Sequence, residues 1–275
     1  MEKYIITSGC SYSDVSMGAW PKHINDFFSD VIVKNYGSCA RGNDYISRTI
    51  ISSVQKLLDD GIKPNNILVL GCWSGLQRRD ILINKESIKQ HFSLSHDPVR
   101  SSYRPPWPVF HTKNENQLNF TKDLPIGEWE GFNEEWWKLI SNEQGIIISF
   151  ENMLRTQWFL RDKNIDYKFF SFVNIFVDSH YFEEWNPKYN TESNVKIIDK
   201  YPNTKCLWDM IDWDKWWFWK NYGGVGNWIL ENVDGGYDKD ELGGMLGHNH
   251  PTEKGCREFT KKVVSIFINN TYNKE

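Results

Sequence analysis

Short apolar runs that alternate with helical stretches constrain the fold of this chain more than any other feature of its sequence. The runs lie at residues 3–8, 31–35, 67–71 and 167–173, and each has the length and composition of a buried strand. Between the second and third runs, apolar residues recur at helical spacing from residue 43 to residue 58. Strands that alternate with helices predict right-handed crossovers and a parallel sheet. We therefore expect an α/β fold with a central parallel sheet.

Two long aromatic-rich segments interrupt this alternation, at about residues 76–144 and 174–246. Segments of this length inside a compact domain usually carry function or form a subdomain. A helix is predicted after the first segment, at residues 143–163. Another is predicted after the second segment, beginning at Pro251, because proline is favoured in the first turn of a helix. We expect one domain over residues 1–275, in which the two segments are insertions.

The composition argues against several classes of protein. A net charge of −4 with 25% charged residues gives no global attraction to nucleic acid or to an anionic membrane. The five cysteines are scattered and include no Cys-x-x-Cys pair, so they suggest neither a disulfide framework nor a zinc ribbon. Reduced thiols and the absence of a signal-peptide pattern at the first residues predict a cytoplasmic location. No apolar run approaches the length of a membrane-spanning helix.

A serine-bearing turn follows the first apolar run. The run breaks at Gly9 and leads into Cys10, Ser11 and Tyr12, and helical spacing follows at residues 20–28. Ligands of α/β sheets bind outside the carboxyl ends of the strands. A serine at this place could act as a nucleophile, with Cys10 beside it at the substrate. The alternative is that Ser11 caps the next helix or satisfies the turn.

Two histidines, His248 and His250, lie in the turn before the last predicted helix. Histidine titrates near neutral pH and is the usual general base for a serine. The two histidines could also bind a metal, but no third ligand stands at motif spacing, so we predict no metal site. A further alternative is a helix-entry turn in which both histidines are exposed.

The order of these motifs resembles that of the SGNH (GDSL-type) hydrolase family, and most of all the divergent SGNH-like proteins of phage and bacterial genomes. Four short segments carry the resemblance, at residues 9–13, 35–44, 69–74 and 250–255. The resemblance implies a three-layer, flavodoxin-like sandwich around the parallel sheet. It also implies a serine esterase without metal or organic cofactor. Its nucleophile would be Ser11 and its base His250, and the N–H groups of Ser11 and Gly37 would bind the oxyanion.

The sequence departs from the family at the third of these segments. Trp73 stands where the family has an asparagine that donates to the oxyanion. An indole N–H could donate there only if the ring turned inward. Asn43, Arg78 or Arg79 could supply the donor instead, and each is equally well explained as a surface residue or a structural hydrogen bond.

The second departure concerns the aspartate that normally precedes the histidine by two or three residues. Those positions hold His248 and Gly247 here. In a serine triad, a base without its orienting carboxylate can lose orders of magnitude in rate. The preceding loop offers four acidic residues that could take this place: Asp234, Asp238, Asp240 and Glu241.

The preferred substrate is a small-molecule or glycan ester, because flat aromatic rings in the insertions suit sugar rings. The tryptophans in question are Trp107, Trp129, Trp136, Trp137, Trp213, Trp216, Trp217 and Trp219. The alternative is that they build a small second core under long loops. The mild acidity and the lack of a basic run disfavour stacking on single-stranded nucleic acid. Two other functions stay open: an SGNH-fold binding protein with little or no activity, and a phage virion or assembly component.

Overall fold

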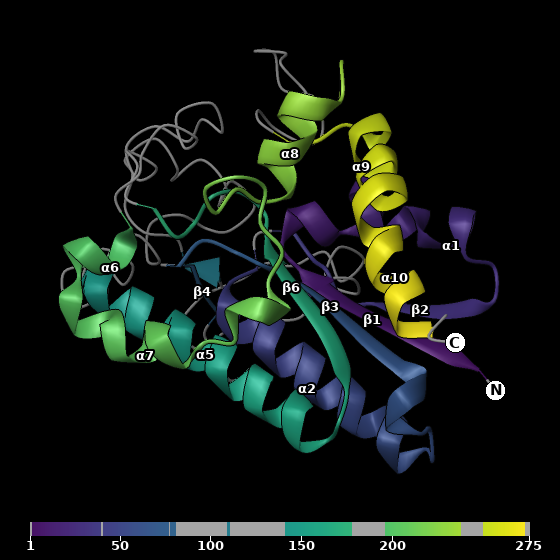
Figure 1. Cartoon of the computed structure of the whole chain (residues 1–275), viewed down its shortest axis with the longest axis horizontal. Coiled ribbons are helices and arrows are strands. Elements are labelled where there is room, and N and C mark those ends of the chain that lie inside the picture. Colours follow the sequence, from purple (N-terminus) through teal and green to yellow (C-terminus); the bar gives the residue numbers. More distant parts are fainter. Residues whose placement is uncertain are drawn as a thin grey trace, which may run out of the picture.

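The structure is a computed structural model, and it describes residues 2–39, 41–76, 78–80, 109–110, 141–177, 196–237 and 250–272. At its centre lies a sheet of four parallel strands (Figure 1). The strands lie in the order β2-β1-β3-β6, and they are β1 (Lys3–Gly9), β2 (Val31–Asn35), β3 (Ile67–Trp73) and β6 (Asp166–Ser171). The parallel α/β fold predicted from the four apolar runs is confirmed. A short antiparallel pair, β4 (Arg79–Asp80) and β5 (Val109–Phe110), lies apart from this sheet.

The α-helices follow the strands in the predicted alternation. The two long ones are α2 (Asn43–Asp59) and α5 (Asn142–Asp162), close to the predicted spans. The shorter ones are α1 (Ile24–Phe27), α6 (Ile197–Lys200), α7 (Lys205–Met210), α8 (Val225–Asn232), α9 (Glu253–Phe259) and α10 (Ser265–Tyr272). A π-helical turn (Thr260–Val264) joins α9 to α10, and 3-10 turns include η1 (Ser11–Ser13), η2 (Val15–Met17) and η3 (Trp20–His23).

Helices cover both faces of the sheet, as two neighbouring residues of β6 demonstrate. Successive side chains of a strand point to opposite faces. Phe169 and Ile50 of α2 both pack against Gly71 on one face. A Cβ added at Gly71 would lie 2.9 Å from the Phe169 ring and 3.3 Å from Ile50. Phe170 packs on the other face, 5.1 Å from the ring of Trp20 and 5.9 Å from that of Phe259 in α9. Every residue of β3 is buried, as expected for a strand of a parallel sheet covered on both faces.

The described part of the second aromatic segment packs onto the main hydrophobic core beside β6. Trp208 and Trp216 are buried, and Trp213 packs 4.2 Å from Trp208. The N–H of Trp217 donates to the carbonyl of Phe169 at 2.8 Å, which extends the edge of the sheet by one bridge. Trp217 and Trp219 are partly buried against the core. These tryptophans are therefore packed in or against the main core instead of forming an exposed platform for sugars or a separate second core.

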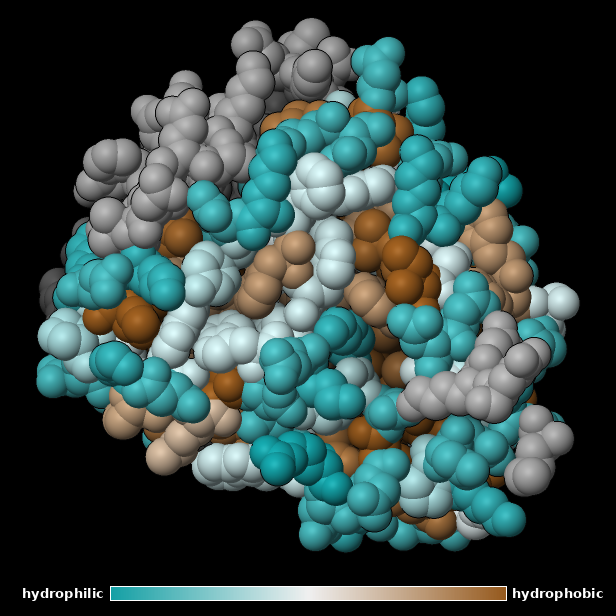
Figure 2. All heavy atoms as spheres, in the orientation of Figure 1, coloured by the Kyte–Doolittle hydropathy of each residue, from teal (hydrophilic) through white to brown (hydrophobic). Residues whose placement is uncertain are grey.

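The tryptophans of the first aromatic segment, Trp107, Trp129, Trp136 and Trp137, lie outside the described residues. Hydrophilic side chains cover most of the described surface on the face that Figure 2 displays. Among the described helices, none has the length and apolar character that crossing a membrane requires.

Candidate active site

The turn after β1 holds Ser11 at the carboxyl edge of the sheet. β1 ends at Gly9, where a Cβ would lie 2.3 Å from the Ser13 hydroxyl oxygen, so only glycine fits this close approach. Ser11 begins η1, and the N–H of Ser13 closes that turn on the carbonyl of Cys10 at 2.8 Å. The Ser11 side chain is 7% exposed, so it can be reached from outside but is surrounded by protein.

The turn before α9 brings His250 to the same place. The Oγ of Ser11 and the Nε2 of His250 lie 2.7 Å apart, although the two residues are 239 positions apart in the sequence. Thr252 caps α9 by accepting a hydrogen bond from the N–H of Gly255. With the ring hydrogen on Nδ1, Nε2 is free to accept the serine proton. The distance is the one that proton transfer from a serine to an imidazole requires.

A shallow depression lies over this pair. It is lined by Ser11, Tyr12, Met17, Ala19, His250, Pro251 and Cys256. Most of these neighbours are apolar. Burial raises the pKa of the Cys256 thiol to about 12, so this thiol stays protonated at neutral pH and does not compete with Ser11 as a nucleophile.

Gly37 lies against the serine turn. A Cβ at Gly37 would lie 2.0 Å from the carbonyl oxygen of Ser13, so no other residue fits there without a shift of the backbone. The N–H of Ser38 donates to the carbonyl of Gly9 at 3.1 Å, which ties the two turns together. Within the described residues, no hydrogen bond uses the backbone N–H of Ser11 or of Gly37. Both N–H groups are therefore available as donors at this edge of the sheet.

Two polar residues that hold the serine turn went unnoticed in the sequence. Asn35, at the end of β2, donates to the carbonyl of Ser13 at 2.9 Å. Asp14 accepts a hydrogen bond from the N–H of Cys39 at 3.0 Å. Asn35 is part of a segment that resembles the family, but spacing gives no sign of its partner. Together these bonds join the turn after β1 to the turn after β2.

Asn43 does not serve as an oxyanion donor in this structure. Its side chain is completely buried, and its amide nitrogen donates to the carbonyls of Ser74 and Gly75 and to the hydroxyl of Ser149. Its amide oxygen accepts from the N–H of Ser74 at 2.9 Å. These bonds occupy the donors of the amide within the protein. The prediction that Asn43 contacts substrate is corrected to a structural role at the start of α2.

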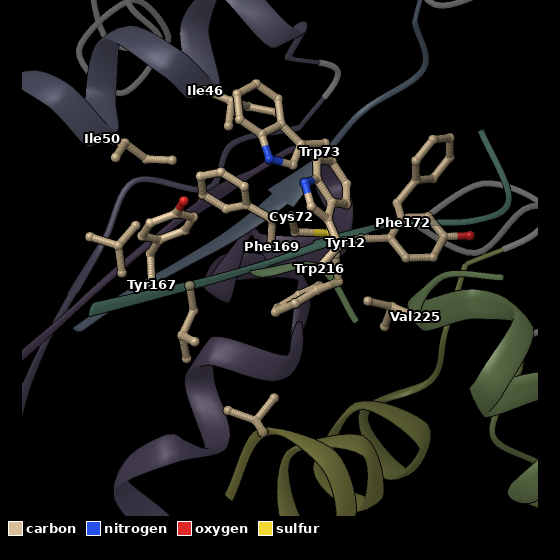
Figure 3. Packing of buried hydrophobic residues seen from close by; sticks show 14 of the residues in the cluster. Tyr12, Ile46, Ile50, Cys72, Trp73, Tyr167, Phe169, Phe172, Trp216 and Val225 are labelled. Atoms are coloured by element: carbon tan, nitrogen blue, oxygen red, sulfur yellow. The ribbon is translucent and has the colours of Figure 1, made fainter. Parts of the chain in front are cut away.

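Trp73 is also an interior residue. Its ring is completely buried and stacks on Trp216, with centroids 6.3 Å apart, and it meets the ring of Phe169 edge-on (Figure 3). It therefore lies on the face of the sheet that α2 covers, whereas His250 stands at the start of α9 on the other face. Its indole N–H is buried without an acceptor among the described residues. The predicted substrate contact of Trp73 does not fit this arrangement.

The remaining predicted residues have different positions. Arg78 donates to the Ser74 hydroxyl at 3.2 Å and lies over the ring of Phe172, which in turn packs against Tyr12. Arg78 does not line the depression at Ser11. Cys10 is completely buried and does not line the depression, so its predicted substrate contact is not observed.

Of the candidate carboxylates, only Asp234 can be judged. It is exposed, and among the described residues no hydrogen bond joins its carboxylate to the His250 ring. Four of the predicted residues, Asp238, Asp240, Glu241 and His248, lie outside the described residues, as does the side chain of Arg79. In the described part of the chain, no three histidine, cysteine or acidic residues are grouped so that they could hold a metal ion.

Comparisons with protein-family models, with curated proteins and with solved structures give no match to this chain. The chemistry of the site is therefore argued from its own geometry.

Proposed function

We propose that this protein is an acyl hydrolase of the SGNH type, in which Ser11 is the nucleophile and His250 the general base. The observation that carries the proposal is the distance of 2.7 Å between the Ser11 oxygen and the His250 Nε2. A serine hydroxyl is a weak nucleophile by itself and needs a base within hydrogen-bond reach. The two residues are 239 positions apart, so it is the fold that brings the imidazole to the serine hydroxyl.

The position of the pair in the sheet supports the same proposal. The strand order β2-β1-β3-β6 matches the first four positions of a flavodoxin-like sheet. In such a sheet the strand order reverses at the switch point between the first and third strands. Ligands of such sheets bind at this reversal, beyond the carboxyl ends of the strands. Ser11 follows β1 at that place, and Gly37 follows the neighbouring β2.

The reaction would proceed in two acyl-transfer steps. The Ser11 oxygen attacks the ester carbonyl while His250 Nε2 takes its proton, and the same proton passes to the leaving alkoxide. The acyl group is then bound to Ser11. Water attacks this acyl group, gives a proton to His250, and releases the acid as Ser11 regains its proton. The N–H groups of Ser11 and Gly37 would stabilise the oxyanion in both steps.

The substrate class is an ester of a small molecule or a glycan. A sugar platform would rest on the tryptophans of the first aromatic segment, because those of the second are packed in or against the main core. A second candidate is an SGNH-fold binding protein with little or no activity. The observation that favours it is the interior position of Trp73.

The deciding experiment is labelling with a fluorophosphonate probe, which reacts with activated serines. The parent is compared with Ser11→Ala and His250→Ala, and Ser16→Ala serves as a matched control because Ser16 is an exposed serine of the same segment. We expect labelling in the parent and in Ser16→Ala, none in Ser11→Ala, and a large decrease in His250→Ala. A folded parent that never labels, while a known serine esterase does, would favour the binding protein.

A further inference from the structure

The imidazole of His250 has a second neighbour besides Ser11. The ring of Tyr12 lies 5.2 Å from the imidazole, centroid to centroid, at an angle of 41°. Tyr12 follows the nucleophile directly in η1, and it is 1% exposed. The same short turn therefore supplies both Ser11 and the aromatic ring that packs against the His250 imidazole.

The Tyr12 ring is itself firmly placed. It meets the ring of Phe172 edge-on, with centroids 5.1 Å apart, and Figure 3 shows the two side by side. On another side, a Cβ at Gly226 would lie 3.1 Å from its Cε1, so the backbone of α8 closes over the ring. Close-packed rings of this kind have few alternative rotamers. Tyr12 can therefore act as a fixed support.

The hydroxyl of Tyr12 extends this support to the segment that carries the base. It forms a short hydrogen bond with the hydroxyl of Tyr237, and Tyr237 pairs with Pro251 in an antiparallel bridge. The N–H of Thr252 donates to the carbonyl of Gly236 at 2.9 Å. The backbone directly after His250 is thus held by residues 235–237, and Tyr12 is bonded to the same short segment.

These contacts close a ring of interactions that runs from Ser11 to His250, through Pro251 to Tyr237, and back through Tyr12. We propose that Tyr12 and Tyr237 are positioning residues that hold the His250 imidazole toward Ser11. This inference rests on the proposed function. It assigns to two buried tyrosines the task of fixing the orientation of a base, which in serine triads falls to a carboxylate. Neither tyrosine takes part in proton transfer.

The test uses Tyr12→Phe, Tyr237→Phe and the double variant, with Tyr167→Phe as the matched control. Tyr167 is a buried tyrosine of β6 outside the site. Each single variant removes one side of the hydrogen bond between the two buried hydroxyls and should unfold at lower temperature. The double variant removes both hydroxyls and should regain much of that stability. If the hydroxyl pair positions His250, the double variant should label with fluorophosphonate about 10- to 100-fold more slowly than the parent, even though its stability has returned. Small misplacements of catalytic groups reduce reaction rates by about this factor.

A merely structural role predicts the opposite, namely that the labelling rate returns to the parental value together with the stability. A second readout does not depend on activity. In protein labelled with isotopes at histidine, the His250 imidazole should give one sharp set of NMR signals in the parent and in Tyr167→Phe, and broadened or multiple signals in the double variant. His250→Ala identifies these signals.

The outcomes separate the two proposals. A parent that labels, with a double variant that labels equally fast and keeps sharp His250 signals, overturns the positioning role and leaves the hydrolase intact. A parent that never labels overturns the hydrolase, and the NMR signals of His250 then decide whether the two tyrosines fix its ring.

Discussion

The side-chain amide of Asn35 donates a hydrogen bond of 2.9 Å to the backbone carbonyl of Ser13, so the end of β2 fixes the turn that carries Ser11. The same amide donates to the hydroxyl of Thr7 at 2.7 Å. The conformation of the turn therefore depends on a neighbouring strand as well as on its own residues. This dependence makes Asn35 the first residue to test outside the Ser11–His250 pair.

Replacement of Asn35 by alanine should lower both stability and reactivity. The loss of these two bonds is expected to reduce the free energy of unfolding by about 1–3 kcal/mol, because buried carbonyl and hydroxyl groups lose their partner. The substitution should also slow fluorophosphonate labelling, because the turn that carries Ser11 loses the hydrogen bond that fixes its conformation. Urea denaturation measures the first effect. The control is Asn232→Ala at an exposed residue of α8, for which a change within about 0.5 kcal/mol is expected. Equal effects of the two variants would contradict the role given to Asn35.

Substitution of Gly37 by alanine should be more damaging than an ordinary glycine substitution. The new Cβ would lie 2.0 Å from the Ser13 oxygen, so the two turns must move apart. Gly61→Ala is the comparison, because a Cβ at Gly61 would meet no other atom. This variant should lose about 1–2 kcal/mol of stability, because alanine is strained at a φ of +83°. Thermal unfolding of both variants measures the difference. A Gly37→Ala protein as stable as Gly61→Ala, with parental labelling, would show that the close approach is unimportant.

Asn43→Ala separates a structural role from a catalytic one. The substitution removes the buried amide that joins α2 to residues 74, 75 and 149, and about 2–4 kcal/mol of stability should be lost through unpaired groups and an unfilled space. The labelling rate per folded molecule should stay near that of the parent. The measurement is labelling at a temperature where the variant is fully folded. A well-folded variant that labels many times more slowly would restore Asn43 to the oxyanion site.

Two surface carboxylates should make the anchoring of α9 sensitive to acid. Hydrogen bonds from Arg257 and then His23 lower the pKa of Asp26 from its ordinary value of 3.8, and Lys22 lowers the pKa of Glu253 from 4.5. Because these pKa values are lower in the folded protein, their stabilisation is present above the ordinary values and is lost as the pH falls through the folded ones. Between pH 5 and pH 3 the double variant Asp26→Asn/Glu253→Gln should therefore lose less stability than the parent. The difference should be small, because exposed ion pairs contribute little to stability. Identical pH profiles of melting temperature would contradict this link.

Much of the fold was open to prediction from the sequence. The four strands are short apolar runs with clear ends, and α2 has one continuous apolar face, so local pattern and tertiary burial agree. Ser11 and His250 were predicted because each ends or begins an element at a place where α/β sheets bind ligands. The structure brings both residues to one edge of the sheet.

The errors concern the direction in which side chains point. Trp73 and Asn43 stand at the carboxyl edge of the sheet in sequence terms, but Trp73 shares the strand face of Gly71 and Phe169 and so points toward α2. Asn43 turns into the interior to satisfy the backbone of Ser74. Neither direction follows from spacing, because it depends on which face each partner covers. The bond between Tyr12 and Tyr237 is equally hidden, since it joins two turns through a contact of side chains only.

The pairing of Ser11 with His250 has a consequence for the order in which the chain is made. Synthesis proceeds from the amino end, so Ser11 leaves the ribosome long before His250. Closing so long a loop costs entropy that only the finished domain recovers. Every shorter nascent chain carries an unactivated serine. Hydrolytic activity, once present, would then report that the last helices have docked on the first strand.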